Sequence, residues 1–172
     1  MKINYKKSLK LMTLITTSLL IAIASAQVYS YMYIKGSGTI TTGGLSWQKG
    51  DSAPTGASIV GYTVENLNLS IPQNQFKNFT DCLRIINNDE TGHIFSLEVT
   101  AVTGNSSKFT TFNLVVYNET GDYGTLNLKT QGNSITGLYI GGSKTMYVRF
   151  EVVPATDQTG SMYFTVKLTY ED

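Results

Sequence analysis

From 162-MYFTVKLTY-170 the chain alternates large apolar residues with mostly polar ones, with a period of two. Successive side chains of an extended strand point to opposite faces, so this period predicts a strand with one buried face. The same alternation recurs at 95–101, 111–116 and 146–152. The residues predicted to face a core are Phe95, Leu97, Val99, Ala101, Phe112, Leu114, Val116, Met146, Val148, Phe150, Val152, Met162, Phe164, Val166, Leu168 and Tyr170.

Turn-forming residues separate these strands, and no window after residue 26 has a helical period. Segments rich in Asn, Asp, Gly and Thr, such as 87–92, 119–122 and 157–160, tolerate positive φ or form local hydrogen bonds. The pattern predicts an all-β fold, a two-sheet sandwich of jelly-roll or immunoglobulin-like type. The segment 36–58, which is rich in glycine and loop-forming residues, reads as less regular and flexible.

Residues 1–26 have the three parts of a secretion signal. Four lysines precede an apolar run at 11–23, and Ala24-Ser25-Ala26 follows as a cleavage site. The run has 13 residues, fewer than the roughly 20 that span a bilayer, although a retained anchor is the alternative. We therefore expect a secreted product without a membrane segment. Its expected parts are an N-terminal strand and hinge at 27–42 and a β-sandwich domain at 43–172.

The charge of the mature chain argues against some partners. Residues 27–172 carry nine basic and 12 acidic residues, a net charge of −3 without basic clusters. Nucleic acid and anionic membranes reward clustered Lys and Arg, so neither is expected as a partner. Cys82 is the single cysteine, which excludes an intramolecular disulfide and predicts a small buried residue.

Residues for catalysis or metal binding are scarce. His93 is the single histidine and lies 11 positions from Cys82, so a zinc site of His and Cys ligands has too few members. Gly36-Ser37-Gly38 is not followed by a helical pattern, so it does not predict a phosphate-binding loop. We expect no catalytic residues, no metal and no cofactor. A secreted hydrolase that uses carboxylates stays open as a third interpretation.

Four Asn-x-Ser/Thr triplets follow the leader. In an exported protein each is a candidate acceptor for an N-linked glycan, given a host with the machinery. The alternative for each is an ordinary polar surface residue. The four acceptors are Asn68, Asn78, Asn105 and Asn118.

The strand directly after the leader, 28-VYSYMYI-34, has two different faces. Val28, Met32 and Ile34 share one parity and are predicted to point into a core, whereas Tyr29, Tyr31 and Tyr33 line the other face. That core belongs either to the same molecule or to a neighbouring copy, whose sheet edge the strand would complete. The sequence leaves both arrangements open.

Several segments taken together resemble the TasA/camelysin-like biofilm-matrix proteins and the similar archaeal bundling-pilus subunits. They are the signal peptide, a first strand followed by glycines, the run 79-FTDCLRIINN-88 and the strand 142-GSKTMYVRFEV-152. The resemblance implies a jelly-roll subunit polymerised by donor-strand complementation into extracellular filaments of a biofilm, with residues 28–34 as the donor strand. Part of the family has been associated with protease activity, but this chain has no His-Glu-x-x-His motif.

The sequence therefore predicts a secreted, non-catalytic filament subunit. Its expected partners are identical subunits, with neighbouring filaments or surface glycans as further partners. The alternative is a monomeric adhesion or carbohydrate-binding sandwich, secreted or held at a surface layer. In that case aromatic residues such as Trp47, Tyr123 and Tyr139 would form the binding platform, although Trp47, beside Leu45, is more typical of a residue that covers a core.

Overall fold

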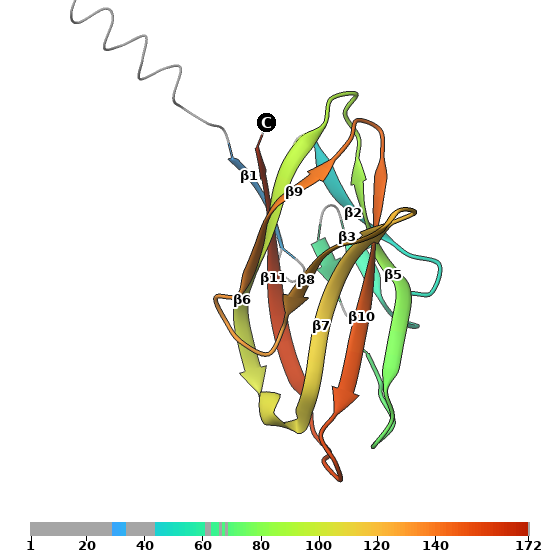
Figure 1. Cartoon of the computed structure of the whole chain (residues 1–172), viewed down its shortest axis with the longest axis vertical. Helices are drawn as coiled ribbons and strands as arrows, with labels where there is room; N and C mark the ends of the chain where they lie inside the picture. Colours follow the sequence, from blue (N-terminus) through green and yellow to red (C-terminus); the bar gives the residue numbers. More distant parts are fainter. Residues whose placement is uncertain (1–28, 34–43, 61–62, 66, 68, 172) are drawn as a thin grey trace, which may run out of the picture.

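The computed structural model describes residues 29–33, 44–60, 63–65, 67 and 69–171, and at 29–33, 60, 63 and 65 it describes the backbone alone (Figure 1). The predicted signal peptide lies outside the described residues, as do Val28, Ile34 and Asn68. No helix within the described ranges is long and apolar enough to cross a membrane.

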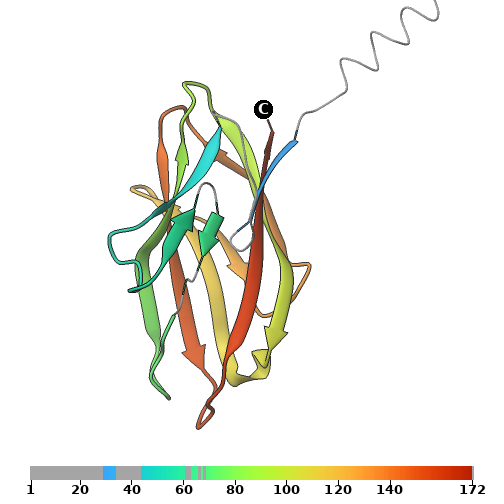
Figure 2. The same ribbon diagram turned by 180° about the vertical axis from the view of Figure 1, so that it is seen from behind.

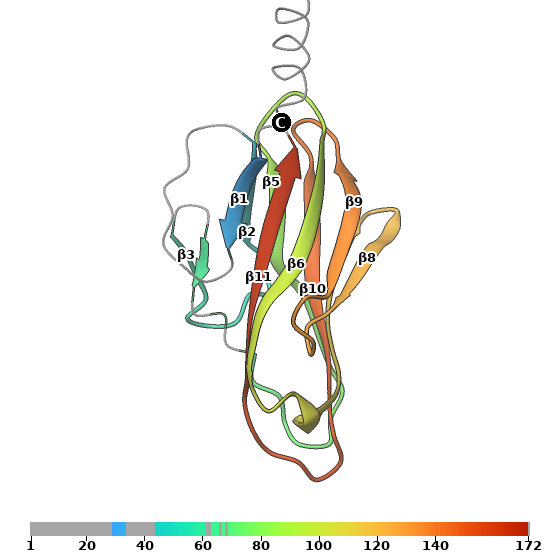
Figure 3. The ribbon, with the colours of Figure 1, turned by 90° about the vertical axis from the view of Figure 1, so that its left-hand side faces the viewer.

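A four-stranded antiparallel sheet forms one layer of the molecule. Its spatial order is β1 (Tyr29–Tyr33), β11 (Met162–Glu171), β6 (His93–Gly104) and β9 (Ser134–Ile140). Figure 3 shows β1 beside β11 at the border of this layer. The longest strand, β6, pairs with β11 from Phe95 to Gly104.

A five-stranded antiparallel sheet forms the second layer. Its spatial order is β2 (Leu45–Lys49), β5 (Lys77–Asn87), β10 (Thr145–Pro154), β7 (Phe109–Asn118) and β8 (Gly121–Asn127). The central strand β10 pairs with β5 on one side and with β7 on the other.

Two short elements lie outside the two layers. The hairpin β3 (Ser58–Val60) and β4 (Thr63–Glu65) forms a small sheet of its own on the side of β1 and β2. A single 3-10 turn, η1 (Ser106–Lys108), connects β6 to β7. Among the described residues η1 is the only helical turn, in agreement with the absence of a helical period in the sequence.

The order of the strands makes this sandwich a jelly roll. From β5 to β11 the chain alternates between the five-stranded and the four-stranded sheet, except at the hairpin β7–β8. Such repeated crossing between two packed antiparallel sheets is the arrangement of a jelly roll. The predicted all-β, two-sheet sandwich is confirmed.

The core lies between the layers, where the period-two pattern predicts it. In β10 the residues Met146, Val148, Phe150 and Val152 are buried, and their neighbours in the strand are half-buried. The ring of Phe164 from the opposite layer lies 6.1 Å from the ring of Phe150. Each large apolar side chain buried in this way stabilises the fold by roughly 1.5–3 kcal/mol.

The segment 36–58 is more regular than its composition indicates. Leu45–Lys49 forms β2, which pairs with β5 and buries Leu45 and Trp47. Trp47 is 3% exposed, so the interpretation of this residue as part of an exposed binding platform is wrong. A five-residue strand between glycines has too few alternating positions to be distinguished from a loop.

Cys82 behaves as the sequence predicts. Its side chain is fully buried and makes no disulfide. Burial, and secondarily the negative charge of Asp81, raises the pKa of the thiol to about 12. The residue therefore acts as a small apolar member of the core rather than as a reactive thiol.

Candidate functional site

The predicted donor strand lies on its own chain in this structure. β1 pairs antiparallel with the last five residues of β11, from Tyr29 opposite Glu171 to Tyr33 opposite Lys167. Residues that lie directly opposite one another in an antiparallel pair share a face of the sheet. The register assigns Met32 to the face of Leu168, which is fully buried, and Tyr31 to the outer face of Thr169.

β1 covers only half of the edge of β11. On its other side β11 pairs with β6 from Met162 to Tyr170, whereas its pairs with β1 begin at Lys167. Among the described residues, no strand pairs with Met162–Val166 on the β1 side. An edge with free N–H and C=O groups is a template for a further strand.

The other sheet is open in the same way. β2 pairs with β5 only from Leu83 to Asn87, although β10 pairs with β5 as far as Lys77. The uncovered halves of β5 and β11 lie toward the same end of the molecule, on the side that carries β1 and β2 (Figure 2). On this side of the molecule β1 and β2 therefore cover one half of the edges of β11 and β5. Among the described residues, the other half of each edge has no strand partner.

A groove of about 910 Å³ lies along the uncovered half of β11. Met162, Tyr163 and Phe164 line it on the strand side, and the buried Phe109 and Phe112 of β7 also contribute. Phe112 and Phe164 contact each other edge to face, with ring centroids 5.4 Å apart. The groove thus combines an unpaired strand edge with an aromatic lining.

An irregular segment between β4 and β5, residues 67–76, borders this groove. Leu67, Leu69 and Ile71 line the groove and pack against the core, but they belong to no strand. A pair of hydrogen bonds also holds this segment in place. Nδ2 of Asn74 donates to Oδ1 of Asp157, and the Asp157 N–H donates to Oδ1 of Asn74, both at 2.9 Å.

A polar cluster holds the end of β11 to which β1 is attached. The ring of His93 is buried; its Nε2 lies 2.7 Å from Oδ2 of Asp89 and its Nδ1 lies 3.0 Å from the carbonyl oxygen of Glu171. The Gly44 N–H also donates to Oδ2 of Asp89, at 2.8 Å. Both partners of the ring are acceptors, so it satisfies both contacts when it carries two protons.

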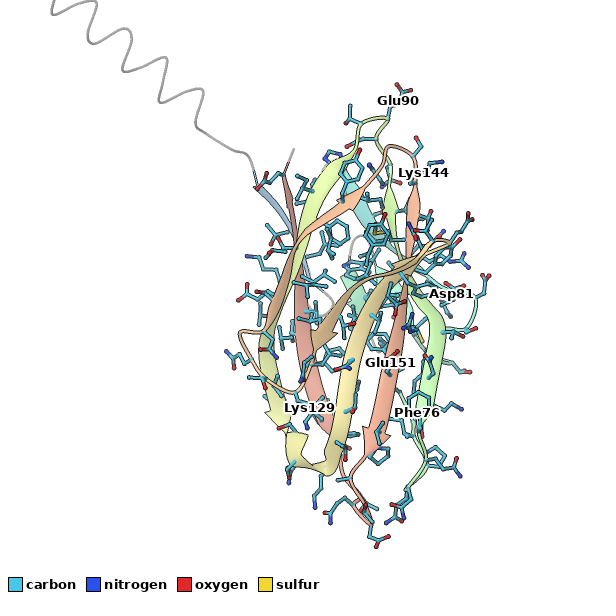
Figure 4. All side chains as sticks on the ribbon, in the orientation of Figure 1. Phe76, Asp81, Glu90, Lys129, Lys144 and Glu151 are labelled. Atoms are coloured by element: carbon cyan, nitrogen blue, oxygen red, sulfur yellow. The ribbon has the colours of Figure 1, made fainter. Side chains whose placement is uncertain are left out.

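This cluster connects three segments that are distant in the sequence. It joins the β5–β6 turn, the end of β11 and the start of β2 at one end of the sandwich, close to the turns that carry Glu90 and Lys144 (Figure 4). The Gly44 N–H, followed by His93, keeps the pKa of Asp89 below its ordinary value. From the sequence, His93 was considered only as a zinc ligand with too few partners; the acidic residue four positions before it, Asp89, was the available signal.

Two arginines on the outer face of the five-stranded sheet each form ion pairs with neighbouring carboxylates. Arg84 pairs with Asp81 at 2.5 Å and with Asp51 at 2.6 Å. Arg149 pairs with Asp122 through both terminal nitrogens, at 2.5 and 2.7 Å. These carboxylates are thus paired with guanidinium groups, and this pairing serves to hold neighbouring strands and turns together. Among the described residues, no three His, Cys, Asp or Glu side chains gather where they could hold a metal ion.

The predicted glycan acceptors and platform tyrosines are spread over the sandwich, and Asn105 lies beside the start of β11, where its N–H donates to the carbonyl oxygen of Ser161 at 3.2 Å. Asn78 is in β5, Asn105 precedes η1, and Asn118 ends β7. Tyr123 in β8 and Tyr139 in β9 are exposed and lie on the opposite side of the sandwich from β1 and β2.

Comparison of the chain with protein families and with curated proteins finds no match.

Proposed function

We propose that the protein is a secreted structural subunit of an extracellular filament, in which β1 of one copy pairs with β11 of the next. The observation that supports this most is the half-covered edge of β11, where β1 attaches beside an open groove lined by both aromatic and polar side chains. Filaments of this kind hold cells together in a biofilm, which is the role that the resemblance implies.

β1 is suited to exchange between copies. It lies at the border of its sheet and, among the described strands, pairs with β11 alone, through five residue pairs. Ten residues, 34–43, separate it from Gly44, a length of chain that reaches at most about 33 Å when extended. A strand that leaves its own subunit through such a connection makes the same contacts on a neighbouring copy. When that contact repeats head to tail without closing into a ring, the copies form an open filament.

A donor strand from another copy gains contacts that β1 lacks here. If the strand continues past Tyr33 in the same register, Ile34 lies opposite Val166 and the following residues run toward Met162, along the uncovered edge. Main-chain hydrogen bonds to that edge fix the register, and the groove accepts apolar surface. Burial of Val28, Met32 and Ile34 contributes roughly 5–9 kcal/mol before the cost of ordering the strand.

A monomeric adhesion or carbohydrate-binding sandwich is the second candidate. Two observations favour it: β1 pairs within its own chain, and Tyr123 and Tyr139 are exposed. Exposed aromatic rings with a polar end are suited to binding at a wet surface. This candidate predicts a stable monomer that binds to a glycan array, and loss of that binding in the Tyr139→Ala variant.

A cysteine-mixing experiment distinguishes the two candidates. Tyr31 and Thr169 lie opposite one another, so Tyr31→Cys and Thr169→Cys are placed on separate chains that also carry Cys82→Ala, and these chains, like the control below, are unfolded, mixed and refolded. Exchange between copies gives a disulfide-linked heterodimer on a non-reducing gel. The matched control mixes Tyr31→Cys with Thr125→Cys, an exposed position on the far edge strand β8, and gives no such band.

Deletion of residues 27–35 tests the filament itself. The shortened protein should fail to form filaments in electron micrographs, and its solutions should contain monomers by light scattering. Filaments of unchanged length from the shortened protein, or a heterodimer absent from the mixture above while filaments form, would overturn the proposal.

A further inference from the structure

The asparagine of one predicted glycosylation triplet, Asn118, is held in a compact turn. Asn118 ends β7 just before the β7–β8 hairpin turn, and its Oδ1 accepts from the Thr120 N–H at 2.8 Å and from the Thr120 hydroxyl at 2.7 Å. Its Nδ2 has no hydrogen-bond partner within the described chain. Glu119 and Thr120 are exposed.

Asn105 has the same arrangement at the other end of β7. Its Oδ1 accepts from the Ser107 N–H at 3.1 Å and from the Ser107 hydroxyl at 2.6 Å. Asn105 and Ser107 are exposed, and Asn105 caps the turn η1. In both triplets the hydroxyl two residues on contacts the asparagine amide, and the amide nitrogen is left free.

Asn78 differs from these two residues in its conformation. It is exposed like Asn105, whereas Asn118 is half-buried. Asn78 lies in β5, opposite Glu151 of β10, in extended backbone. Residues two apart in a strand are separated by about 6.6 Å, and no hydrogen bond joins Asn78 to Thr80. The third described triplet therefore has the sequence of an acceptor without the turned conformation.

We propose that Asn105 and Asn118 are acceptors for N-linked oligosaccharide on the folded protein and that Asn78 is not. In the reaction a bond forms between Nδ2 and the anomeric carbon of a lipid-pyrophosphate-linked oligosaccharide. The bond from that carbon to the pyrophosphate oxygen breaks, and the lipid pyrophosphate leaves with the electron pair. The amide loses one proton to a base of the oligosaccharyltransferase.

The selectivity follows from what the transferase must reach. It has to engage the amide nitrogen and the hydroxyl two residues later at the same time, which requires a bent chain. At Asn105 and Asn118 this bend exists and two donors fix the amide orientation, so no ordering cost arises. At Asn78 the backbone is part of the ladder with β10 and must first be released.

A glycan at Asn118 lies away from the β1 edge, whereas Asn105, whose N–H donates to the carbonyl oxygen of Ser161, lies beside the start of β11. Asn118 ends β7, which pairs with β8, and β8 is the edge of its sheet farthest from β2. Tyr123 in β8 and Asp122, which pairs with Arg149, are its neighbours in the hairpin. The inference does not depend on the proposed filament, because it rests on the local conformation of each triplet.

The experiment compares the folded and the unfolded chain as substrates of the same oligosaccharyltransferase. Folded protein and protein unfolded in urea are incubated with a purified single-subunit oligosaccharyltransferase, active in that urea, and a polyprenyl-pyrophosphate oligosaccharide, and sites are located by peptide mass spectrometry. The folded protein should be modified at Asn105 and Asn118 with at least tenfold lower occupancy at Asn78, and unfolding should remove that difference. Occupancy of Asn78 in the folded protein equal to that of Asn118, or no modification of Asn105 and Asn118, would overturn the proposal.

Two matched variants separate the turn from the triplet. Thr120→Ser keeps the hydroxyl and should keep Asn118 modified, whereas Thr120→Ala should abolish modification there and leave Asn105 unaffected. Asn127 makes the same turn, with its Oδ1 accepting from the Lys129 N–H at 2.9 Å, but lacks the hydroxyl. Lys129→Thr, at the half-buried position that Figure 4 labels, should therefore make the exposed Asn127 a new acceptor in the folded state. Failure of Lys129→Thr to gain a glycan while Asn118 is modified would show that the turn is not sufficient.

Discussion

The Nδ1 atom of His93 lies 3.0 Å from the carbonyl oxygen of Glu171, the residue of β11 that lies opposite Tyr29 of β1. Through its other ring nitrogen His93 contacts Asp89, which also accepts from the Gly44 N–H. Gly44, which follows residues 34–43, thus contacts the carboxylate partner of the ring, and β1, which precedes them, pairs with the residue whose carbonyl oxygen contacts the ring. The end of β11 that receives β1 is therefore fixed by a side-chain hydrogen-bond cluster as well as by the sheet.

The Asp89→Asn variant should weaken this end of the sandwich. The substitution removes the charged carboxylate that accepts these hydrogen bonds, so the free energy of unfolding in urea at pH 7 should fall by about 1.5–3 kcal/mol. The pKa of Asp89 is lowered by the Gly44 N–H and by His93. A lowered carboxyl pKa stabilises the fold above the unfolded value, about 3.9, and this contribution disappears as the pH falls through the folded value. The variant should therefore lose less stability than the wild type on acidification below about pH 4.

Asp122→Asn is the matched control for that experiment. Asp122 is half exposed in its ion pair with Arg149, and solvent screens such pairs, so the cost at pH 7 should be about 0–1 kcal/mol. Equal losses for the two variants would contradict a special role for the contact between Asp89 and His93.

Local alternation was enough to predict the strands that build the core. The period at 95–99 and 146–152 matches the buried residues of β6 and β10. In β7 Phe112, Leu114 and Val116 are buried as predicted, but Val115, of the opposite parity, is buried too. Ala101 was predicted to face the core and is only half-buried. The register of β6 against β11 shifts between Thr165 and Val166, next to Ala101, and such a bulge ends a simple alternation of faces.

The candidate site could not be predicted in the same way. The groove exists because β1 ends opposite Lys167 and β2 ends opposite Leu83, and both endpoints depend on pairs between residues far apart in the sequence. Alternation in 28–34 indicates two faces for a strand but not the strand that it joins. The short strand β2 was missed for a related reason, since its assignment depends on pairing with β5 rather than on its composition.

The Phe150→Ala variant tests the packing between the two layers. Phe150 is fully buried and its ring lies 6.1 Å from that of Phe164, so truncation removes contacts and leaves a cavity. The free energy of unfolding in urea should fall by roughly 3–5 kcal/mol. Tyr163→Ala, at a position 61% exposed, should change it by less than about 0.5 kcal/mol. A loss below 1 kcal/mol for Phe150→Ala would mean that this ring is not part of a close-packed core.

The thiol of Cys82 should be unreactive in the folded protein. Because burial raises the pKa of the thiol from an ordinary value of 9.0 to about 12, the thiolate fraction at pH 8 falls roughly a thousandfold. A chromogenic disulfide reagent should therefore label no thiol in native buffer and one thiol per chain in denaturant. Thr125→Cys, at an exposed position, should add one thiol that reacts at once in native buffer. Rapid labelling of the wild-type protein would contradict the burial of Cys82.

The pair of hydrogen bonds between Asn74 and Asp157 should control access to the groove beside β11. Asn74 has a φ of 57°, which glycine adopts without strain, so Asn74→Gly removes both bonds and leaves the turn possible. Residues 67–76 are then held by apolar packing alone, and chymotrypsin should cleave several-fold faster after the exposed Phe76, at the position labelled in Figure 4. Ser143→Gly, at a φ of 53° in the turn at the other end of the molecule, should leave that cleavage rate unchanged.

If the groove receives a donor strand, Asn74→Gly should also polymerise faster than Ser143→Gly in light-scattering time courses, because the segment that borders the groove moves aside more easily. Equal cleavage and equal polymerisation rates for the two variants would show that the pair does not hold the segment in place.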